Sequence, residues 1–210
     1  LTGVTSTSAW TAYQNGDRNF CGNELPDGMR KNEAFPEPII TPSTKAAQGE
    51  HDESVAPSEL YKRGVVDPGL YKELARISMK LYERGVARAA DHGMIFVDTK
   101  YEFGISNGKI MLMDEVNTPD SSRYWIKDDY ESRFEKGEEP RKLDKEYVRT
   151  WLSEQGFTGE GTPPKLTDDI RVEASARYME VVEKFTGEPM QLDVGPVDES
   201  IYSILNPFAY

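Results

Sequence analysis

Residues 94–116 read MIFVDTKYEFGISNGKIMLMDEV, and their alternation of polar and apolar side chains predicts a β-hairpin. The two strands are expected over residues 94–104 and 110–116. Successive side chains of a strand point to opposite faces, so Asp98, Lys100 and Glu102 share one face, while the other face is aromatic and apolar. The hairpin therefore predicts one face packed on a core and one ionic face.

The position of Asp114 relative to the ionic face depends on the turn between the strands. A three-residue turn at residues 106–108 would set Asp114 opposite Lys100. A two-residue turn at residues 107–108 would set it opposite Tyr101, on the apolar face. Burying an unpaired carboxylate is strongly unfavourable. We therefore expect the three-residue turn, which brings Asp114 to the ionic face.

Two carboxylates and one ammonium group would then converge on a single face of the sheet. Glu102 and Asp114 supply oxygen ligands of the kind that a divalent cation prefers, and Lys100 could neutralise a phosphate or an oxyanion. A solvated ladder of salt bridges on an exposed sheet face is the alternative interpretation. The spacing of the residues alone leaves both interpretations open.

A polar loop is expected directly after the second strand, where residues 117–123 read NTPDSSR. Polar loops at strand ends are common places for functional sites. Arg123 could bind a phosphate or a carboxylate with two hydrogen bonds, helped by the hydroxyl groups of Ser121 and Ser122. A turn in which Asp120 caps its own backbone is an equally good interpretation of these residues.

Three helices are predicted outside the hairpin. The first begins at Asp67, an N-cap residue, with Pro68 at the first helical position, and it ends at Gly93. The other two are expected over residues 144–156 and 167–187. The first 58 residues are rich in Gly, Pro, Ser, Thr and Asn and predict loops with short strands. Together these elements favour an α+β fold, a mainly antiparallel sheet flanked by helices.

The composition excludes several classes of protein. The chain has 25 Lys and Arg against 37 Asp and Glu, a net charge of −12, so a nucleic acid polymer is not an expected partner. The single cysteine, Cys21, excludes an intrachain disulfide and favours a reducing, cytoplasmic location. With only His51 and His92, a zinc site of Cys and His ligands is nearly excluded. The longest apolar runs fall far short of the ~20 residues that a membrane helix needs, so no membrane partner is expected.

Segments before the first predicted helix also carry groups suited to binding anions or metals. Residues 41–45 combine hydroxyl groups with an ammonium group, and residues 50–53 set three acids around His51. A metal phosphohydrolase would need further histidines, and the chain offers only His92, so a surface position is favoured for His51. Residues 3–8 could wrap an anion with hydroxyl groups and backbone amides, although they lack the lysine of a P-loop.

Four motifs stand out when the chain is taken as a whole. They are FPEPIITPSTK at residues 35–45, GEHD at 49–52, DTKYEFG at 98–104 and DEVNTPDSSRYW at 114–125. In this order they closely resemble the phosphoribosylaminoimidazole-succinocarboxamide synthases, or SAICAR synthetases, of purine biosynthesis. The similarity extends from Leu1 to about Gly187, and motifs of this length are highly specific.

The resemblance implies an ATP-dependent ligase assisted by magnesium. In this family the carboxylate of carboxyaminoimidazole ribonucleotide is activated by ATP as an acyl phosphate, and the amine of L-aspartate then displaces phosphate to form the succinocarboxamide. The ionic face of the hairpin suits that chemistry, because a carboxylate and a triphosphate repel each other until cations lie between them. ATP, L-aspartate and the ribonucleotide are therefore the small-molecule partners that the resemblance implies.

The resemblance also assigns roles to individual residues. Lys100 is implied to be the catalytic residue that contacts the reacting carboxylate or phosphoryl group, and Glu102 and Asp114 are implied to approach the magnesium ions. The substrate-binding residues are implied to be Ser8, Lys45, Asp52, Asp120, Ser122 and Arg123. Within that set, Arg123 would bind the ribonucleotide phosphate with Ser8, for which Ser6 is an alternative. Lys45 and Asp52 would orient the imidazole.

The chain departs from the family at its beginning. The Gly-rich nucleotide loop, the adenine pocket and a substrate-binding arginine of the family lie N-terminal to the point where this sequence starts. We therefore expect residues 1–187 to form a SAICAR synthetase-like substrate- and metal-binding domain, residues 188–210 to be an appendage, and the isolated chain to turn over weakly or not at all.

Two other functions are compatible with the same residues. One is another magnesium-nucleotide phosphotransferase, such as a kinase, which would need no aspartate. The other is a non-catalytic acidic binding module, whose ionic hairpin would be only a solvated surface. A homo-oligomer is compatible with the sequence as well.

Overall fold

The computed structural model describes residues 1–3, 8–44, 53–157, 159, 161–190, 195–196, 199 and 202. Its helices are α1 (Ala9–Gln14), α2 (Pro57–Lys62), α3 (Pro68–Asp91), α4 (Tyr130–Lys136), α5 (Glu146–Glu154) and α6 (Asp168–Thr186). Its strands are β1 (Asn19–Phe20), β2 (Asn23–Glu24), β3 (Met94–Thr99), β4 (Glu102–Ser106), β5 (Lys109–Met113) and β6 (Ser122–Ile126).

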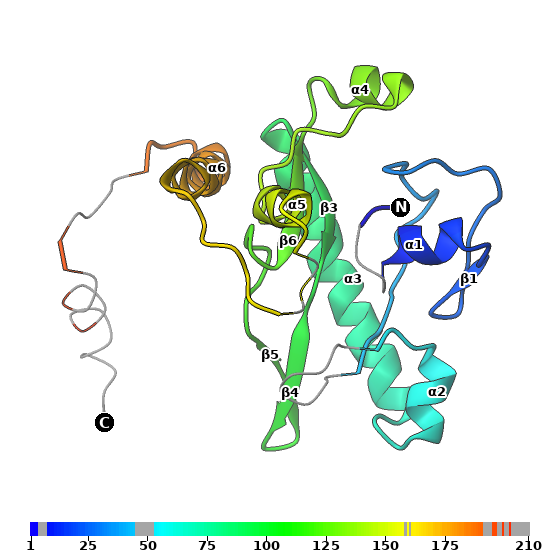
Figure 1. Cartoon of the computed structure of the whole chain (residues 1–210). Coiled ribbons are helices and arrows are strands. Elements are labelled where there is room, and N and C mark those ends of the chain that lie inside the picture. The colour runs from blue at the N-terminus through cyan, green and yellow to red at the C-terminus, as the bar shows by residue number, and fades with distance from the viewer. Residues whose placement is uncertain are drawn as a thin grey trace.

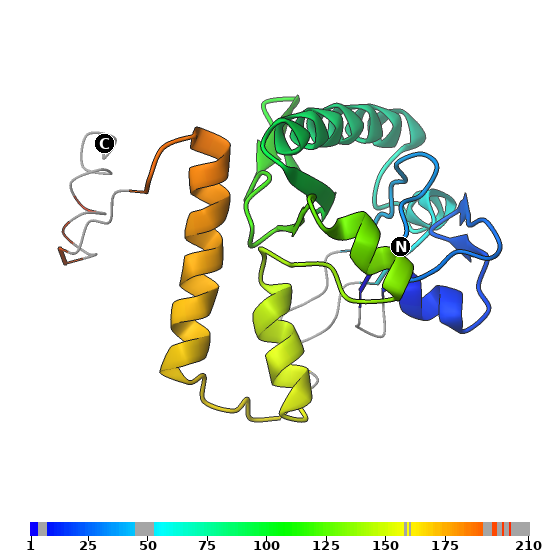
Figure 2. The same ribbon diagram turned by 90° about the horizontal axis from the view of Figure 1, so that it is seen from above.

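The strands of the described residues form antiparallel pairs, namely β1 with β2, β3 with β6, and β4 with β5. The β3–β6 pair lies between α3 and α5, and α6 packs beside α5 (Figures 1 and 2). The segment that carries α1, β1 and α2 lies on the side of the molecule opposite α6. The α+β prediction is confirmed, with the antiparallel sheet divided into two-stranded units.

The main core fills the space between the β3–β6 pair and the helices that cover it. Its most buried members are Ala89 of α3, Met94 and Phe96 of β3, Tyr124 and Ile126 of β6, Leu143, and Val181 of α6. Tyr82 and Phe185 pack against this cluster. Burial of such side chains supplies most of the free energy that holds the helices on the sheet. The well-packed strands β3 and β6 therefore position the polar residues of the site that they carry.

The predicted helix boundaries are confirmed where local capping signals are strong. Asp67 caps α3 by accepting hydrogen bonds from the backbone N–H groups of Gly69 and Leu70. Thr167 caps α6 through the N–H of Ile170, and Gly187 ends that helix at φ 75°. The short helices α1, α2 and α4 were not predicted, because six or seven residues show too little periodicity to be recognised.

The predicted three-residue turn of the hairpin is wrong. Ser106 pairs with Lys109, so only Asn107 (φ 51°) and Gly108 (φ 74°) connect β4 and β5. Positive φ at both positions is the geometry of a type I′ turn, which Asn-Gly favours. The longer turn was expected because the shorter one would bury the carboxylate of Asp114. However, β5 ends at Met113, and Asp114 turns out of the strand at φ 61°.

The expected strand over residues 94–104 is also divided. It breaks after Thr99, because β3 pairs with β6 while β4 pairs with β5. Residues 122 and 123, which were expected in a polar loop, instead begin β6. The side chains of Tyr124, Trp125 and Ile126 in that strand are buried. Their burial depends on the pairing of β6 with β3, which is distant in the sequence.

Helices able to span a membrane are absent from the part of the chain that the structure describes. No helix there is both long enough and apolar enough to cross a bilayer.

Candidate functional site

The ionic end of the hairpin forms where β3 passes into β4. The Nζ atom of Lys100 lies 2.7 Å from Oε1 of Glu102 and 3.8 Å from Oδ2 of Asp114. The left-handed backbone of Asp114 returns its carboxylate toward Lys100, so the two carboxylates meet the ammonium group despite the shorter turn. The Lys100 side chain is 54% exposed, and ion pairs this exposed add little to stability. The arrangement is therefore better suited to ligand binding than to holding the fold.

The donor set at this end fits a magnesium-nucleotide complex better than a permanently bound metal. Among the described residues, no group of three or more His, Cys, Asp and Glu side chains could hold a metal ion. Mg²⁺ is commonly bound through one or two carboxylates, with phosphate oxygens and water completing its shell. Glu102 and Asp114 match that pattern, with Lys100 beside them to balance the added phosphate charge.

Arg123 lies at the other polar centre, on β6. Asp98 is its cross-strand partner on β3, and Arg123 Nη1 lies 2.6 Å from Asp98 Oδ2. Its Nη2 atom lies 3.1 Å from Oε1 of Glu146 on α5. Burial on its own would lower the pKa of Arg123, but the carboxylates of Asp98, Glu146 and Asp144 outweigh it and raise that pKa. The guanidinium group is thus held charged and in a fixed direction.

Ser122 and Asp120, two predicted substrate-binding residues, occupy different environments next to Arg123. Ser122 is buried, and its Oγ lies 2.8 Å from Thr99 Oγ1 across the β3–β6 pair. Asp120 is half exposed, and its Oδ1 lies 3.3 Å from Lys145 Nζ. Burial would raise the pKa of Asp120, but hydrogen bonding and the nearby Lys145 and Lys100 lower it overall. In this turn the Oγ1 atom of Thr118 accepts a hydrogen bond from the backbone N–H of Ser121 at 3.3 Å.

Ser8 acts locally in the structure as the N-cap of α1. Its Oγ accepts a hydrogen bond from the N–H of Thr11 at 3.2 Å and lies 2.9 Å from Thr11 Oγ1. Gly3 approaches it so closely, at φ 113°, that a Cβ on Gly3 would lie 2.5 Å from Cβ of Ser8. Lys45 and Asp52, together with Ser6 and His51, lie outside the described residues.

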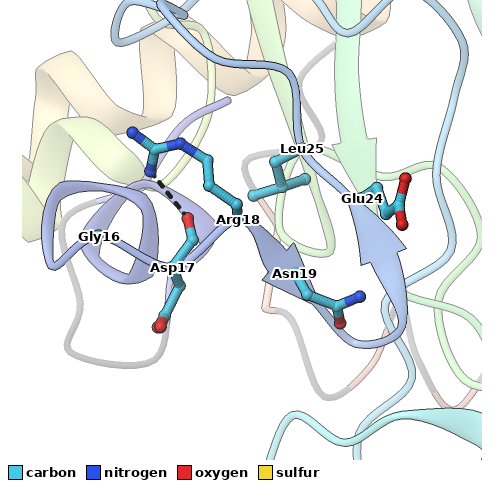
Figure 3. A pocket seen from close by; sticks show the side chains of 6 residues that line it. All are labelled: Gly16, Asp17, Arg18, Asn19, Glu24 and Leu25. Carbon is cyan, nitrogen blue, oxygen red and sulfur yellow. Dashed lines mark hydrogen bonds between the residues drawn. The ribbon is translucent and has the colours of Figure 1, made fainter.

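A cavity of about 1090 Å³ connects the hairpin to the N-terminal segment. Asp98, Thr99 and Lys100 line it at the point where β3 ends, and residues of α3, of β4 and of the first 43 positions form much of its other walls. A second, shallower depression of about 520 Å³ lies around Arg18, whose Nη1 donates to the backbone oxygen of Asp17 at 3.0 Å (Figure 3). Only the first of these cavities contains a residue predicted for the site.

The family of the chain follows from a comparison with known sequences. The sequence model of the family described as SAICAR synthetase matches residues 2–165. The chain belongs to the SAICAR synthetase family. It is 51% identical over 188 residues to the phosphoribosylaminoimidazole-succinocarboxamide synthase of Bacteroides thetaiotaomicron, an alignment that covers 89% of this chain and 60% of that relative. It is also 44% identical over 204 residues to the chloroplastic synthase of Arabidopsis thaliana, covering 96% of this chain and 49% of that protein.

Solved SAICAR synthetases share the fold. The SAICAR synthase of Saccharomyces cerevisiae, solved in complex with SAICAR, superposes with a TM-score of 0.71 at 34% identity, covering 88% of this chain and 57% of that one. A SAICAR synthetase in complex with ADP gives a TM-score of 0.57 at 26% identity and covers 78% of this chain and 57% of that one. The chain spans about 60% of the length of the Bacteroides thetaiotaomicron relative.

Two buried acids beside Arg123 were not singled out from the sequence. Asp144 is 2% exposed and accepts backbone hydrogen bonds from Tyr124 at 2.9 Å and Glu146 at 2.8 Å, so it fastens the start of α5 to β6. Glu146 is 3% exposed and contacts Arg123 and Arg149. In the sequence, both acids look like ordinary helix-start residues. Their contacts with β6 are long-range, and no local signal reveals them.

The buried Asp144 predicts a pH-dependent stability. Burial raises its pKa to about 6, above the ordinary value of 3.8, although two backbone N–H groups and Arg123 act in the opposite direction. Because the folded chain then holds this proton more tightly than the unfolded chain, its contribution to stability is fully present below pH 3.8 and is lost as the pH rises toward 6.

The difference in unfolding free energy between the wild-type chain and Asp144→Asn isolates this titration. We expect the unfolding free energy of the wild-type chain to fall by about 2 kcal/mol relative to that of Asp144→Asn as the pH rises from 4 to 7. Urea unfolding of both proteins over that range measures it. A difference that stays constant with pH would contradict the raised pKa.

Proposed function

We propose that the chain carries the catalytic hairpin of an ATP- and Mg²⁺-dependent ligase that joins L-aspartate to the carboxylate of carboxyaminoimidazole ribonucleotide, yielding SAICAR, ADP and phosphate. The observation that carries the proposal is the contact of Lys100 with both Glu102 and Asp114 at the end of the hairpin. Membership of the SAICAR synthetase family supports the choice of substrates. A single cysteine in 210 residues supports a cytoplasmic location.

The proposed reaction has two steps that balance without any further reagent. An oxygen of the ribonucleotide carboxylate attacks the γ-phosphorus of ATP, the bond to the ADP oxygen breaks, and an acyl phosphate and ADP form. The amine of L-aspartate then attacks the acyl carbon, phosphate leaves with the electron pair of the C–O bond, and the nitrogen loses a proton. Bound magnesium would reduce the repulsion between the carboxylate and the triphosphate.

Within this proposal each residue of the hairpin has one role. Lys100 stabilises the negative charge on the reacting carboxylate and phosphoryl oxygens. Glu102 and Asp114 would hold magnesium. The partly buried Arg123, aligned by Asp98, binds the ribonucleotide phosphate.

The remaining substrate-binding residues complete the proposal. Asp120 and Ser122 would lie near the substrate, and Ser8 would contribute to the phosphate site. Lys45 and Asp52 would orient the imidazole. Residues 1–187 would act as one domain, with residues 188–210 as an appendage.

The two other candidate functions are less well supported. A non-catalytic acidic surface would leave the ionic residues in bulk solvent and far from Arg123. Instead, Asp98 lies 2.6 Å from Arg123, and the Glu102 side chain is only 23% exposed. A magnesium-nucleotide phosphotransferase could use the same hairpin, and only its substrates would distinguish it from the proposed ligase.

The test is an ADP-release assay of a full-length enzyme that contains these 210 residues. We expect ADP release with magnesium only when both L-aspartate and the imidazole ribonucleotide are present, together with formation of the succinocarboxamide. ADP release that needs the ribonucleotide but not aspartate, with a phosphorylated product, would support a phosphotransferase. No binding of nucleotide or ribonucleotide would support the non-catalytic module.

A further inference from the structure

A carboxylate of α5 brings two arginines together beside the proposed phosphate site. Oε1 of Glu146 lies 3.1 Å from Nη2 of Arg123, and the same oxygen contacts Nη1 of Arg149 one helical turn later. Two guanidinium groups repel each other unless a negative charge lies between them. Glu146 supplies that charge, and its side chain is only 4% exposed, so the arrangement is shielded from water and salt.

The position of Glu146 is itself fixed by the fold. Asp144 accepts hydrogen bonds from the N–H of Glu146 and from the N–H of Tyr124, the residue that follows Arg123 on β6. The N–H of Leu143 also donates to the carbonyl oxygen of Tyr124 at 2.8 Å. These hydrogen bonds therefore hold the first turn of α5 against the strand that carries Arg123.

Two features indicate that Arg123 and Arg149 can together bind an anion in addition to Glu146. The Nε atom of Arg123 is buried and has no hydrogen-bond acceptor among the residues that the structure describes. Arg149 keeps 39% of its side chain exposed although one of its nitrogens contacts the buried Glu146. A guanidinium group has five N–H donors, so both arginines retain donors beyond those used on Glu146.

We propose that Arg149 binds the ribonucleotide phosphate together with Arg123, and that Glu146 is the positioning residue that holds the two guanidinium groups side by side. The inference rests on the proposed function, which gives Arg123 the phosphate as its ligand. A phosphate monoester carries up to two negative charges and three acceptor oxygens, which two adjacent guanidinium groups match better than one.

The experiment compares a ribonucleotide with its dephosphorylated nucleoside. Aminoimidazole carboxamide ribonucleotide and the corresponding nucleoside are titrated calorimetrically into the full-length enzyme that contains these 210 residues and into its Arg149→Met and Glu146→Gln variants. The ratio of the two affinities isolates the phosphate, because a general loss of structure would weaken both ligands. Arg76→Met is the matched control, since Arg76 contacts Glu73 at the same three-residue helical spacing on the exposed surface of α3.

We expect Arg149→Met to reduce the preference for the nucleotide by about 10- to 100-fold, with nucleoside affinity unchanged. Glu146→Gln should reduce the same preference by a smaller factor, and Arg76→Met should leave it unchanged. A wild-type preference that survives in Arg149→Met would overturn the inference while leaving the proposed function intact. If Arg149→Met loses the preference for the nucleotide while Glu146→Gln keeps the full wild-type preference, the positioning role of Glu146 would be overturned. A wild-type chain without any preference for the nucleotide would overturn the phosphate assignment of Arg123, and the inference with it.

Discussion

Replacing Lys100 with methionine in the full-length enzyme is expected to lower kcat by about 100- to 1,000-fold, the usual effect of removing one group that stabilises charge in a transition state. The ammonium group forms ion pairs with both carboxylates of the hairpin, the two groups that would hold magnesium in the proposed reaction. Methionine keeps most of the length of the side chain and removes its charge and its N–H donors.

The fold should tolerate this change. The Lys100 side chain is 54% exposed, and its ion pairs lie at the surface, where they contribute little to stability. We therefore expect the melting temperature of Lys100→Met to match that of the wild-type protein within error. A matched control is Lys62→Met, because Lys62 also lies near a glutamate, Glu59, but on α2. Normal turnover by Lys100→Met would remove the catalytic role assigned to this lysine.

Replacing Glu146 with alanine is expected to lower the free energy of unfolding by about 3–5 kcal/mol, the usual cost of breaking a buried ion pair from one side. The substitution leaves the guanidinium groups of Arg123 and Arg149 without the carboxylate they share. Asp98 still pairs with Arg123, so we expect a value near the lower end of this range.

Urea unfolding of the 210-residue chain measures this effect. The control is Glu73→Ala, which removes an exposed glutamate that contacts Arg76 at the same spacing and should cause no measurable change. Equal stability of Glu146→Ala and Glu73→Ala would show that the buried network on α5 is not structurally important.

The sequence predicts the parts of this fold that depend on neighbouring residues. Asp67 and Thr167 each reach a backbone N–H two or three positions ahead, so the start of α3 and of α6 can be predicted from a few letters. The Asn107-Gly108 turn is also a local signal, and it was rejected because a buried Asp114 was assumed. The backbone of Asp114 leaves the strand, which the alternation of side chains could not reveal.

The rest of the site depends on contacts between distant segments. The strand β6 exists because Tyr124 and Ile126 are buried against β3, and the letters before it favour a loop. Asp144 and Glu146 look like residues of a helix start until the fold brings Arg123 to them. Such pairs carry no signal in a single sequence, because each partner taken alone has an ordinary local explanation.

The measurement that tests the central claim most directly is a magnesium titration of ADP release by the full-length enzyme and its Glu102→Gln and Asp114→Asn variants. Both substitutions keep side-chain shape and remove one negative charge from exposed or partly exposed positions, so folding should be preserved. If the hairpin holds the magnesium-nucleotide complex, the magnesium concentration for half-maximal activity should rise by about 10-fold or more in each variant, as expected when a metal-binding group is lost. Magnesium dependence identical to that of the wild-type enzyme in both variants would contradict the account.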